Sequence, residues 1–207
     1  RRIVDKGVMP VIIGGDHSIT AATGKGLEDL GPFHVLQIDA HLDWADHRSG
    51  QRYGHGSCIR RLSEMDHVKN IYQYGIRGIS SSLKEDVDAA RDYGATILSP
   101  KQMREQGPEG LAGLIPEGEK LYITIDIDGI DPSIAPGTGT PSPGGLLYDE
   151  VNELLKAVAK HNEVVGFDLV EVAPMYDPTG MTGQTAARLM LDLLSYVLKE
   201  RELKEGR

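Results

Sequence analysis

The sequence predicts an α/β protein with three layers, in which a parallel β-sheet lies between two layers of helices. Short apolar runs rich in Val and Ile, bounded by Gly, Pro and Asp, recur between longer helix-like stretches. The 207 residues are 40% hydrophobic and 26% charged, which is typical of a globular protein with one full core. Because no internal repeat or linker divides the chain, we expect a single domain spanning residues 1–207.

Six short apolar segments are expected to form the strands, since buried parallel strands are continuous hydrophobic runs. They are residues 8–13, 34–39, 70–75, 95–99, 121–126 and 164–170. The stretches between them predict helices, several of which begin near Ser, Thr or Gly. These helices are residues 18–30, 81–93, 101–112, 148–160 and 183–203. Residues 136–145 are too rich in Gly and Pro for either element, so we expect a loop at the end of the sheet.

The overall charge excludes one class of partner. With 31 acidic and 22 basic side chains the net charge is −9, which argues against nucleic acid, because phosphate binding needs clustered Lys and Arg. No apolar run approaches the roughly 18 residues of a membrane span, so no membrane association is expected. The single cysteine, Cys58, cannot form an internal disulfide, and we expect a cytoplasmic protein.

Acidic and imidazole side chains crowd the ends of three predicted strands. Residues two apart in an extended chain point the same way, so side chains within each cluster can converge. Four carboxylates facing one another would repel strongly unless cations compensated them. Two divalent cations would balance the four aspartates, and two neutral imidazoles would complete the coordination. The six candidate ligands are His17, Asp39, His41, Asp43, Asp126 and Asp128.

The ligand types indicate which metal to expect. Oxygen-rich ligation with two imidazoles and no thiolate favours manganese, then iron, nickel or cobalt, over a tetrahedral structural zinc site. A calcium loop starting at Asp126 is excluded, because its glycine comes too early and no glutamate closes it. Gly24-Lys25-Gly26 lacks the Ser or Thr of a phosphate-binding loop.

Four stretches together carry a resemblance that covers nearly the whole chain. They are Gly14-Gly15-Asp16-His17-Ser18, Asp39-Ala40-His41-Leu42-Asp43, the run from Asp126 to Gly139, and Asp168-Leu169-Val170-Glu171-Val172-Ala173-Pro174. In order and spacing they resemble the ureohydrolase family of arginases, agmatinases and guanidino-acid hydrolases. The ending Glu-Val-Ala-Pro followed by Met175-Tyr176-Asp177 is most similar to the agmatinase branch.

The resemblance implies an arginase-like fold, two Mn²⁺ per chain and hydrolysis of a guanidinium group to urea and an amine. It implies that a hydroxide bridging the two metals attacks the guanidinium carbon. His17 and Asp43 would bind the more exposed manganese, with Ni²⁺, Fe²⁺ or Co²⁺ as alternatives. His41 and Asp128 would bind the second ion, and the remaining two ligands, Asp39 and Asp126, would contact both.

Three residues are expected to act in catalysis. Asp43 could accept a hydrogen bond from the hydroxide and aim it. Glu171 matches the family glutamate that pairs with the substrate guanidinium, where a planar fork facing a carboxylate fixes orientation. His55, in Tyr53-Gly54-His55-Gly56, matches the family histidine that passes a proton to the leaving amine.

The chain departs from the family in length. Members are usually about half as long again, so the domain is expected to be incomplete at its N-terminus, with the absent strands together at one edge of the sheet. An exposed strand edge and an uncovered apolar face would follow. The resemblance also implies a homo-oligomer, either a trimer or a hexamer.

The substrate prediction comes from a second departure. Arginine-specific members have an Asn two residues after the second Asp of the Asp-Ala-His motif, where this chain has Ala45. We therefore expect a guanidino compound without an α-amino acid head, with agmatine first. The alternatives are a short guanidino acid whose carboxylate meets Arg48 or Arg52, a formimidoyl-glutamate substrate, and a metal-binding homologue without activity.

Overall fold

One parallel six-stranded sheet forms the centre of the molecule. The computed structural model describes residues 2–78, 82–204 and 206. The strands are β1 (Val11–Ile13), β2 (Phe33–Ile38), β3 (Val68–Tyr74), β4 (Thr96–Leu98), β5 (Lys120–Asp126) and β6 (Glu163–Val170). They are ordered β1-β6-β5-β2-β3-β4, and every neighbouring pair is parallel. The predicted fold class is confirmed.

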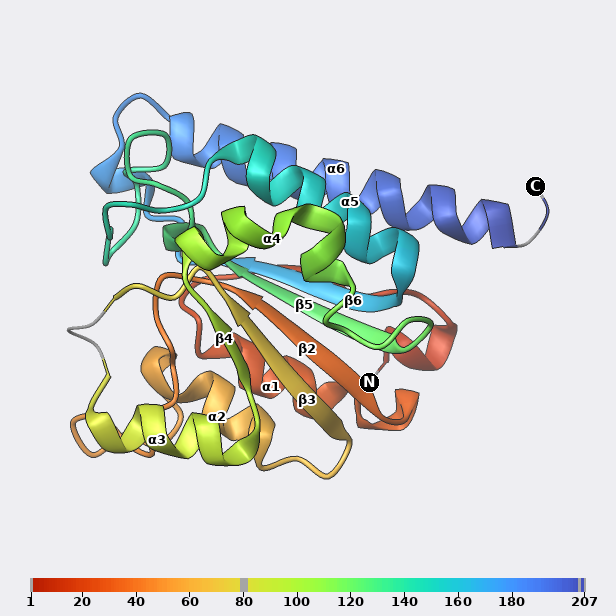
Figure 1. Cartoon of the computed structure of the whole chain (residues 1–207), viewed down its shortest axis with the longest axis horizontal. Coiled ribbons are helices and arrows are strands. Elements are labelled where there is room, and N and C mark those ends of the chain that lie inside the picture. The colour runs from red at the N-terminus through yellow and green to blue at the C-terminus, as the bar shows by residue number, and fades with distance from the viewer. Residues whose placement is uncertain (1, 79–81, 205, 207) are drawn as a thin grey trace.

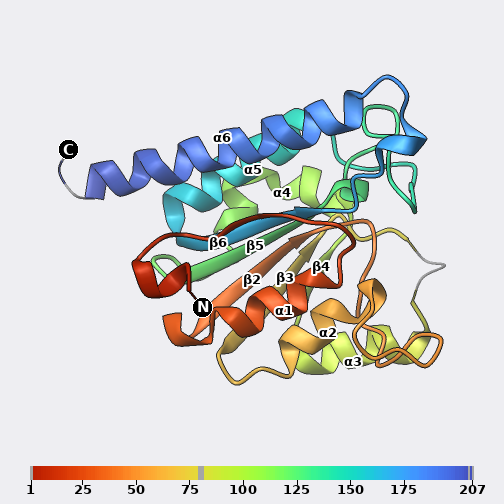
Figure 2. The ribbon, with the colours of Figure 1, turned by 180° about the vertical axis from the view of Figure 1, so that it is seen from behind.

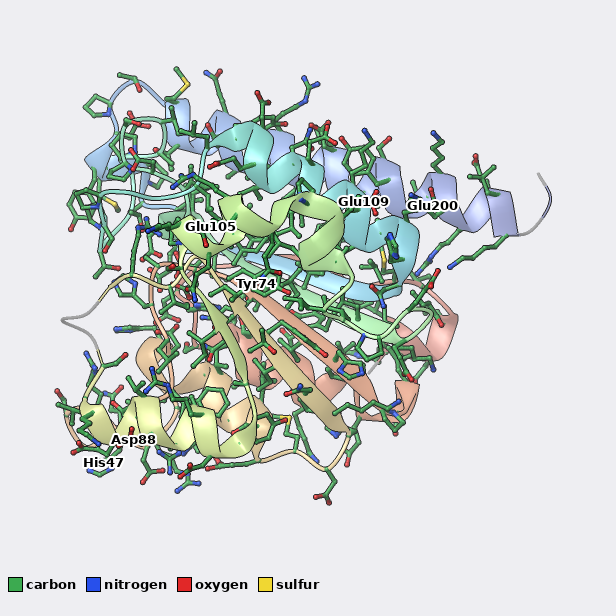
Figure 3. The ribbon with its side chains drawn as sticks, viewed as in Figure 1. His47, Tyr74, Asp88, Glu105, Glu109 and Glu200 are labelled. Atoms are coloured by element: carbon green, nitrogen blue, oxygen red, sulfur yellow. The ribbon has the colours of Figure 1, made fainter. Side chains whose placement is uncertain are left out.

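Helices cover both faces of this sheet (Figures 1 and 2). One layer consists of α4 (Pro100–Ala112), α5 (Tyr148–His161) and α6 (Met181–Lys204), and the other of α1 (Ile19–Gly26), α2 (Cys58–Ser63) and α3 (Lys84–Tyr93). Each layer has its own hydrophobic cluster against the sheet. Tyr74 on β3 lies between the sheet and α4, where its hydroxyl donates to Leu111 O at 2.9 Å (Figure 3). No helix within the described residues is both long and apolar enough to cross a bilayer.

All six predicted strands are present, with shifts at their ends. The first predicted strand, residues 8–13, is observed only from Val11 to Ile13. The predicted range includes Pro10, which has no N–H to donate to a neighbouring strand. The central strand β2 is buried along its whole length, as its continuous apolar run predicts. By contrast, β1 lies at one edge of the sheet and leaves the Ile13 side chain 81% exposed.

The observed helices differ from the predicted ones at several ends, in a break within α4 and in one additional short helix. The expected helix 18–30 ends at Gly26 and continues as a 3-10 turn, Glu28–Leu30. Gly107 has φ 68 and breaks α4, because Pro108 disfavours helical backbone in the residue before it. The six-residue helix α2 was not predicted, since so short a segment shows no periodicity. The expected helix 81–93 begins at Lys84, and its first predicted residue lies outside the described residues.

The parallel arrangement decides where the polar clusters meet. The carboxyl ends of all six strands lie at one edge of the sheet. The loops that follow β1, β2, β5 and β6 therefore approach each other there, although they are far apart in sequence (Figure 1). α/β proteins place ligand sites outside this edge.

Candidate metal centre

The first group of side chains surrounds His17, which follows β1 through two glycines. A Cβ on Gly14 would lie 2.3 Å from Ile19 Cδ1 and 2.7 Å from Val170 Cγ1, so any larger residue here would force these two side chains to move. The His17 side chain is buried, and its Nδ1 faces three carboxylates. The distances from this atom are 2.9 Å to Asp43 Oδ2, 3.1 Å to Asp39 Oδ2 and 3.3 Å to Asp126 Oδ2.

A second group surrounds His41 and shares one aspartate with the first. His41 Nδ1 lies 2.9 Å from Asp128 Oδ2 and 3.6 Å from Asp39 Oδ1. The two oxygens of Asp39 thus face different imidazoles, one in each group. Both Asp39 and Asp128 are buried. Asp39 is placed where one carboxylate could contact two cations.

Both groups fit divalent cations. His17 Nδ1 is a buried atom with no hydrogen-bond partner among the described residues, although three carboxylate oxygens lie close to it. Two ligands bound to one octahedral cation at about 2.1 Å and at right angles lie about 3 Å apart. The measured nitrogen–oxygen separations of 2.9 to 3.3 Å agree with that geometry. Asp39, His41 and Asp128 likewise bring ligand atoms within 4.8 Å of one another.

The electrostatics of the centre call for positive charge. Burial, followed by the charges of Asp43 and Asp128, raises the pKa of Asp39 to about 8. Burial and the charges of Asp128 and Asp39 also raise the pKa of Asp126 well above its usual range. Burial lowers the pKa of His41, but the hydrogen bond and charge of Asp128 outweigh it and raise this pKa to about 8. Bound cations would neutralise the repulsion among the aspartates and favour the ionised form of each buried carboxylate.

A buried hydrogen-bond network fixes the orientation of His17. Its Nε2 lies 2.9 Å from Thr124 Oγ1, which donates to Asp168 Oδ1 at 2.6 Å. Thr20 Oγ1 donates to the other oxygen of Asp168 at 2.9 Å, and the Tyr122 hydroxyl also donates to it. Such partners set the ring orientation of a ligand histidine. Asp168 had been noted only as part of a motif, although an aspartate inside an apolar strand signals such a supporting role.

A matching network holds the loop after β2. Gln37 Nε2 donates to Asp39 Oδ2 at 2.6 Å, and Gln73 Nε2 donates to Gln37 Oε1 at 2.6 Å. The backbone N–H of His41 donates to Asp39 Oδ1 at 2.6 Å. These bonds fix both oxygens of Asp39, and neither glutamine was singled out from the sequence.

Residues from both groups line a pocket of about 220 Å³. Both histidines, Asp43 and Asp126 reach its wall, and the predicted catalytic residues His55 and Glu171 lie in the same wall. Asp39 and Asp128 are buried behind it. The structure therefore brings together every residue that the sequence selected for the site. The full lining is Asp16, His17, His41, Asp43, Arg48, His55, Gly56, Asp126, Gly139, Thr140 and Glu171.

Two of these residues have a strained backbone. Asp43 has φ 50 and Glu171 has φ 66, in the left-handed region that non-glycine residues rarely adopt. Glu171 is held by the hydrogen bond from its N–H to Gly15 O at 2.9 Å. Its Oε1 accepts from the backbone N–H of His17 at 2.8 Å. Strain of this kind is typical of functional sites.

Cys58 is a neighbour of the centre that the sequence did not reveal. Its buried Sγ lies 3.6 Å from Asp43 Oδ2, and it forms a third possible ligand group with His17 and Asp43. Burial raises the pKa of the thiol. A sequence signal was available, since Cys58 comes only three residues after His55.

The two arginines considered for substrate binding separate in the structure. Arg48 lines the pocket. Arg52 does not, and its guanidinium instead donates to both carboxylate oxygens of Glu64 at 3.1 and 3.0 Å. Of these two arginines, Arg48 is thus the one placed at the pocket.

Comparison with known proteins gives consistent matches over most of the chain. The model of the Arginase family matches residues 1–195. Proclavaminate amidinohydrolase of Streptomyces clavuligerus is 40% identical over 190 residues, which cover 89% of this chain and 60% of that protein. Its solved structure superposes with a TM-score of 0.83 at 36% identity, covering 92% of this chain and 64% of the other.

Two further relatives are named for different activities. A guanidinobutyrase of Pseudomonas aeruginosa is 35% identical over 199 residues, covering 93% of this chain and 62% of that protein. An agmatinase of Bacillus anthracis is 34% identical over 197 residues, covering 93% and 65%. The chain thus spans a little under two thirds of the length of these relatives.

Proposed function

Since this chain belongs to the arginase family, we propose that it is a binuclear-metal amidinohydrolase that converts a linear guanidino compound to urea and an amine. One observation carries this proposal: two adjoining groups of carboxylates and imidazoles open into the same pocket as Glu171 and His55. A metal pair alone would fit many hydrolases. A carboxylate facing it across a small pocket suits a cationic, planar substrate group.

We assign the cations to the two groups as follows. His17 and Asp43 would hold the ion nearer the pocket, His41 and Asp128 would hold the other, and the two remaining aspartates, Asp39 and Asp126, would be shared between them. Two Mn²⁺ ions suit this oxygen-rich set. When bound, they lower the pKa of a shared water and so supply a nucleophile near neutral pH.

Glu171 binds and orients the substrate in this proposal. A guanidinium is a poor electrophile because its charge is spread over three nitrogens, so correct placement of its carbon is decisive. The carboxylate of Glu171 accepts hydrogen bonds from the guanidinium, and the strained backbone and His17 N–H fix its position. Asp43, which lines the same pocket, accepts a hydrogen bond from the attacking water and aims it.

His55 completes the reaction at the exposed side of the pocket. Oxygen from water bonds to the guanidinium carbon, the bond from that carbon to the alkyl nitrogen breaks, and urea forms. The leaving nitrogen needs a proton to depart as an amine, and a His55 ring nitrogen supplies it. His55 starts a 3-10 turn, His55–Ser57, whose last residue precedes α2, and this fixes it beside the pocket.

The test is urea release together with metal analysis. With Mn²⁺ added, the purified chain should release urea from agmatine or 4-guanidinobutyrate, with arginine a poor substrate. Asp126→Ala should abolish urea release, and the purified variant should contain at least one equivalent of metal less per chain than the wild type. Full metal occupancy with no hydrolysis of any guanidino compound would favour the non-catalytic alternative. Formamide released from formimidoyl-glutamate, with no urea from any guanidino compound, would identify a formimidoyl substrate.

A cytoplasmic location and a trimer or hexamer are additional expectations. Light scattering after size-exclusion chromatography would measure the oligomeric state. A monomer with full activity would contradict that expectation.

A further inference from the structure

The pocket contains a cation that the reaction itself does not use. Among the described lining residues Arg48 is the one arginine or lysine, and it shares the wall with four carboxylates. Two of these, Asp43 and Asp126, face the metal groups. Glu171 is assigned to the substrate guanidinium, and this leaves Arg48 to meet another part of the substrate.

The backbone of Arg48 is fixed by a tight turn. Its N–H donates to Gln51 O at 2.9 Å, and the Gln51 N–H donates to Arg48 O at 2.8 Å. The two residues between them, Ser49 and Gly50, have φ 51 and φ 76, as a two-residue hairpin turn of type I′ requires. The turn therefore presents Arg48 from a defined position.

The guanidinium itself packs beside the predicted proton donor. A Cβ on Gly56 would lie 3.5 Å from Arg48 Nε and 3.9 Å from Arg48 Cζ. Gly56 is the residue after His55, so the guanidinium lies across the loop that carries His55. This places the charge at the side of the pocket from which the amine would leave.

The other arginines of this region are already paired, whereas Arg48 is not. Arg52 and Arg61 both donate to Glu64, and Arg60 lies 3.7 Å from Asp46. Within the described part of the chain, Arg48 has no ion-pair partner. An unpaired guanidinium lining a small pocket favours a negatively charged ligand.

We propose that Arg48 binds the carboxylate at the far end of an ω-guanidino acid whose guanidinium lies at Glu171. This inference rests on the proposed function and specifies its substrate class. A carboxylate would form two parallel hydrogen bonds with the arginine fork. The terminal ammonium of agmatine would instead be repelled by Arg48. The structure thus reverses the order of preference that the branch resemblance had suggested.

One feature of the pocket favours agmatine, and it defines the competing outcome. Asp16 also lines the wall and is exposed, so its carboxylate could attract an ammonium. However, Asp16 Oδ1 already accepts hydrogen bonds from the Ser18 backbone N–H, at 3.1 Å, and from the Ser18 hydroxyl. One of its two oxygens is thus already engaged, whereas the Arg48 guanidinium has no ion-pair partner within the described residues.

The experiment compares three substrates of matched length: 4-guanidinobutyrate, agmatine and uncharged butylguanidine. In the wild type, kcat/KM should be highest for the acid. Arg48→Met should lower kcat/KM for the acid about 100-fold, mainly through KM, and affect butylguanidine much less. Arg48→Glu should make agmatine the preferred substrate. Arg52→Met is the matched control and should leave all three values unchanged.

The outcomes separate this inference from the proposed function. A wild type that prefers agmatine, or an Arg48→Met variant that loses all three substrates equally, would overturn the role of Arg48 while urea release still supports the function. If the wild type releases no urea, the proposed function fails. Equilibrium binding of 4-guanidinobutyrate and butylguanidine to the Mn²⁺-loaded protein then decides the role of Arg48. The role of Arg48 is supported if the wild type binds the acid more tightly than butylguanidine and Arg48→Met removes this difference. Equal binding of the two compounds to the wild type overturns it.

Discussion

The backbone N–H of His17 donates a hydrogen bond to Glu171 Oε1 at 2.8 Å, across 154 residues of sequence. The bond joins the loop after β1 to the loop after β6, and these strands are neighbours in the sheet. One oxygen of Glu171 is therefore used for positioning, and the other is available to a ligand. The hydrogen bond thus fixes the position of Glu171, which is expected to bind the substrate, relative to His17, which is expected to bind metal.

Replacing Glu171 by Gln separates charge from position. The amide oxygen can still accept from the His17 N–H, but the negative charge that attracts a guanidinium is lost. We expect kcat/KM for the substrate to fall by 100-fold or more, with unchanged metal content and an unchanged melting temperature. Steady-state urea assays and elemental analysis measure this. A variant with near wild-type kcat/KM would remove Glu171 from substrate binding.

Asp126→Asn should change stability in opposite directions with and without metal. In metal-free protein the substitution removes one of several buried, mutually repelling carboxylates, so the melting temperature should rise. In the wild type, added Mn²⁺ should raise the melting temperature strongly because it binds only the folded state. The variant should lose most of that metal-dependent gain.

Thermal melts with chelator and with a series of Mn²⁺ concentrations test this prediction. His67→Gln is the control for a buried polar side chain outside the centre, since its Nε2 lies 3.0 Å from Gly24 O. It should keep the full metal response. An Asp126→Asn protein that is stabilised by Mn²⁺ as much as the wild type would show that Asp126 is not a ligand.

Arg77 is a positioning residue for the loop that carries Asp128. Its Nη2 donates to Asp128 O at 2.7 Å and to Ser142 O at 2.6 Å, and its Nη1 donates to Gly75 O at 3.0 Å. Arg77→Met keeps the apolar stem but leaves these carbonyls without a donor. We expect a loss of about 2 to 4 kcal/mol in the free energy of unfolding.

The same substitution should also weaken metal binding. We expect affinity for the ion held by His41 and Asp128 to fall about 10- to 100-fold, as for other residues that support ligands. Isothermal titration of Mn²⁺ and denaturant unfolding measure the two effects. The control, Arg188→Met, removes an exposed arginine paired with Asp192 and should change stability by about 0.5 kcal/mol or less. Equal effects of the two substitutions would contradict the positioning role.

The sequence predicted the strands well because their apolar runs are continuous, and the four central strands are largely buried. It also predicted that the acidic clusters converge, since parallel strands end at one edge and residues two apart share a face. The helices were predicted less accurately, because local sequence preferences do not fix where a helix breaks or whether a very short one forms. Gly107 with Pro108 broke a predicted helix, and the short helix α2 has too few residues to show a period.

The supporting residues of the site were harder to predict than its candidate ligands. Gln37, Gln73 and Thr124 belong to buried strands, where a single polar residue is recognisable but its partner is not. Their partners lie on neighbouring strands, and only the strand order reveals them. The sequence already suggested Arg48 or Arg52 for substrate binding, but only the folded loop shows that Arg48 lines the pocket.

Asp131 should make stability depend on pH in a narrow acidic range. Its Oδ1 accepts from the Ser133 N–H at 3.0 Å, and its Oδ2 accepts from the N–H groups of Gly144 and Gly145 at 2.8 Å each. The bonds from Ser133 first, and then those from Gly145 and Gly144, lower the pKa of Asp131 to about 2. The ordinary pKa of an aspartate is about 3.9. The folded state therefore binds this proton more weakly than the unfolded state does.

The sign of the effect follows from that difference. The stabilisation by Asp131 is complete above about pH 4 and is lost as the pH falls through 2. Asp131→Asn should lower the melting temperature by roughly 2 to 8 °C at pH 6 to 7, for a loss of about 1 to 2 kcal/mol. Between pH 4 and pH 2 the wild-type and variant curves should converge. Because other carboxylates titrate in both proteins, their effects cancel in the difference, and Asp5→Asn, which changes an exposed residue, controls for the loss of one charge. A difference that stays constant or grows on acidification would show that these hydrogen bonds do not stabilise the ionised form.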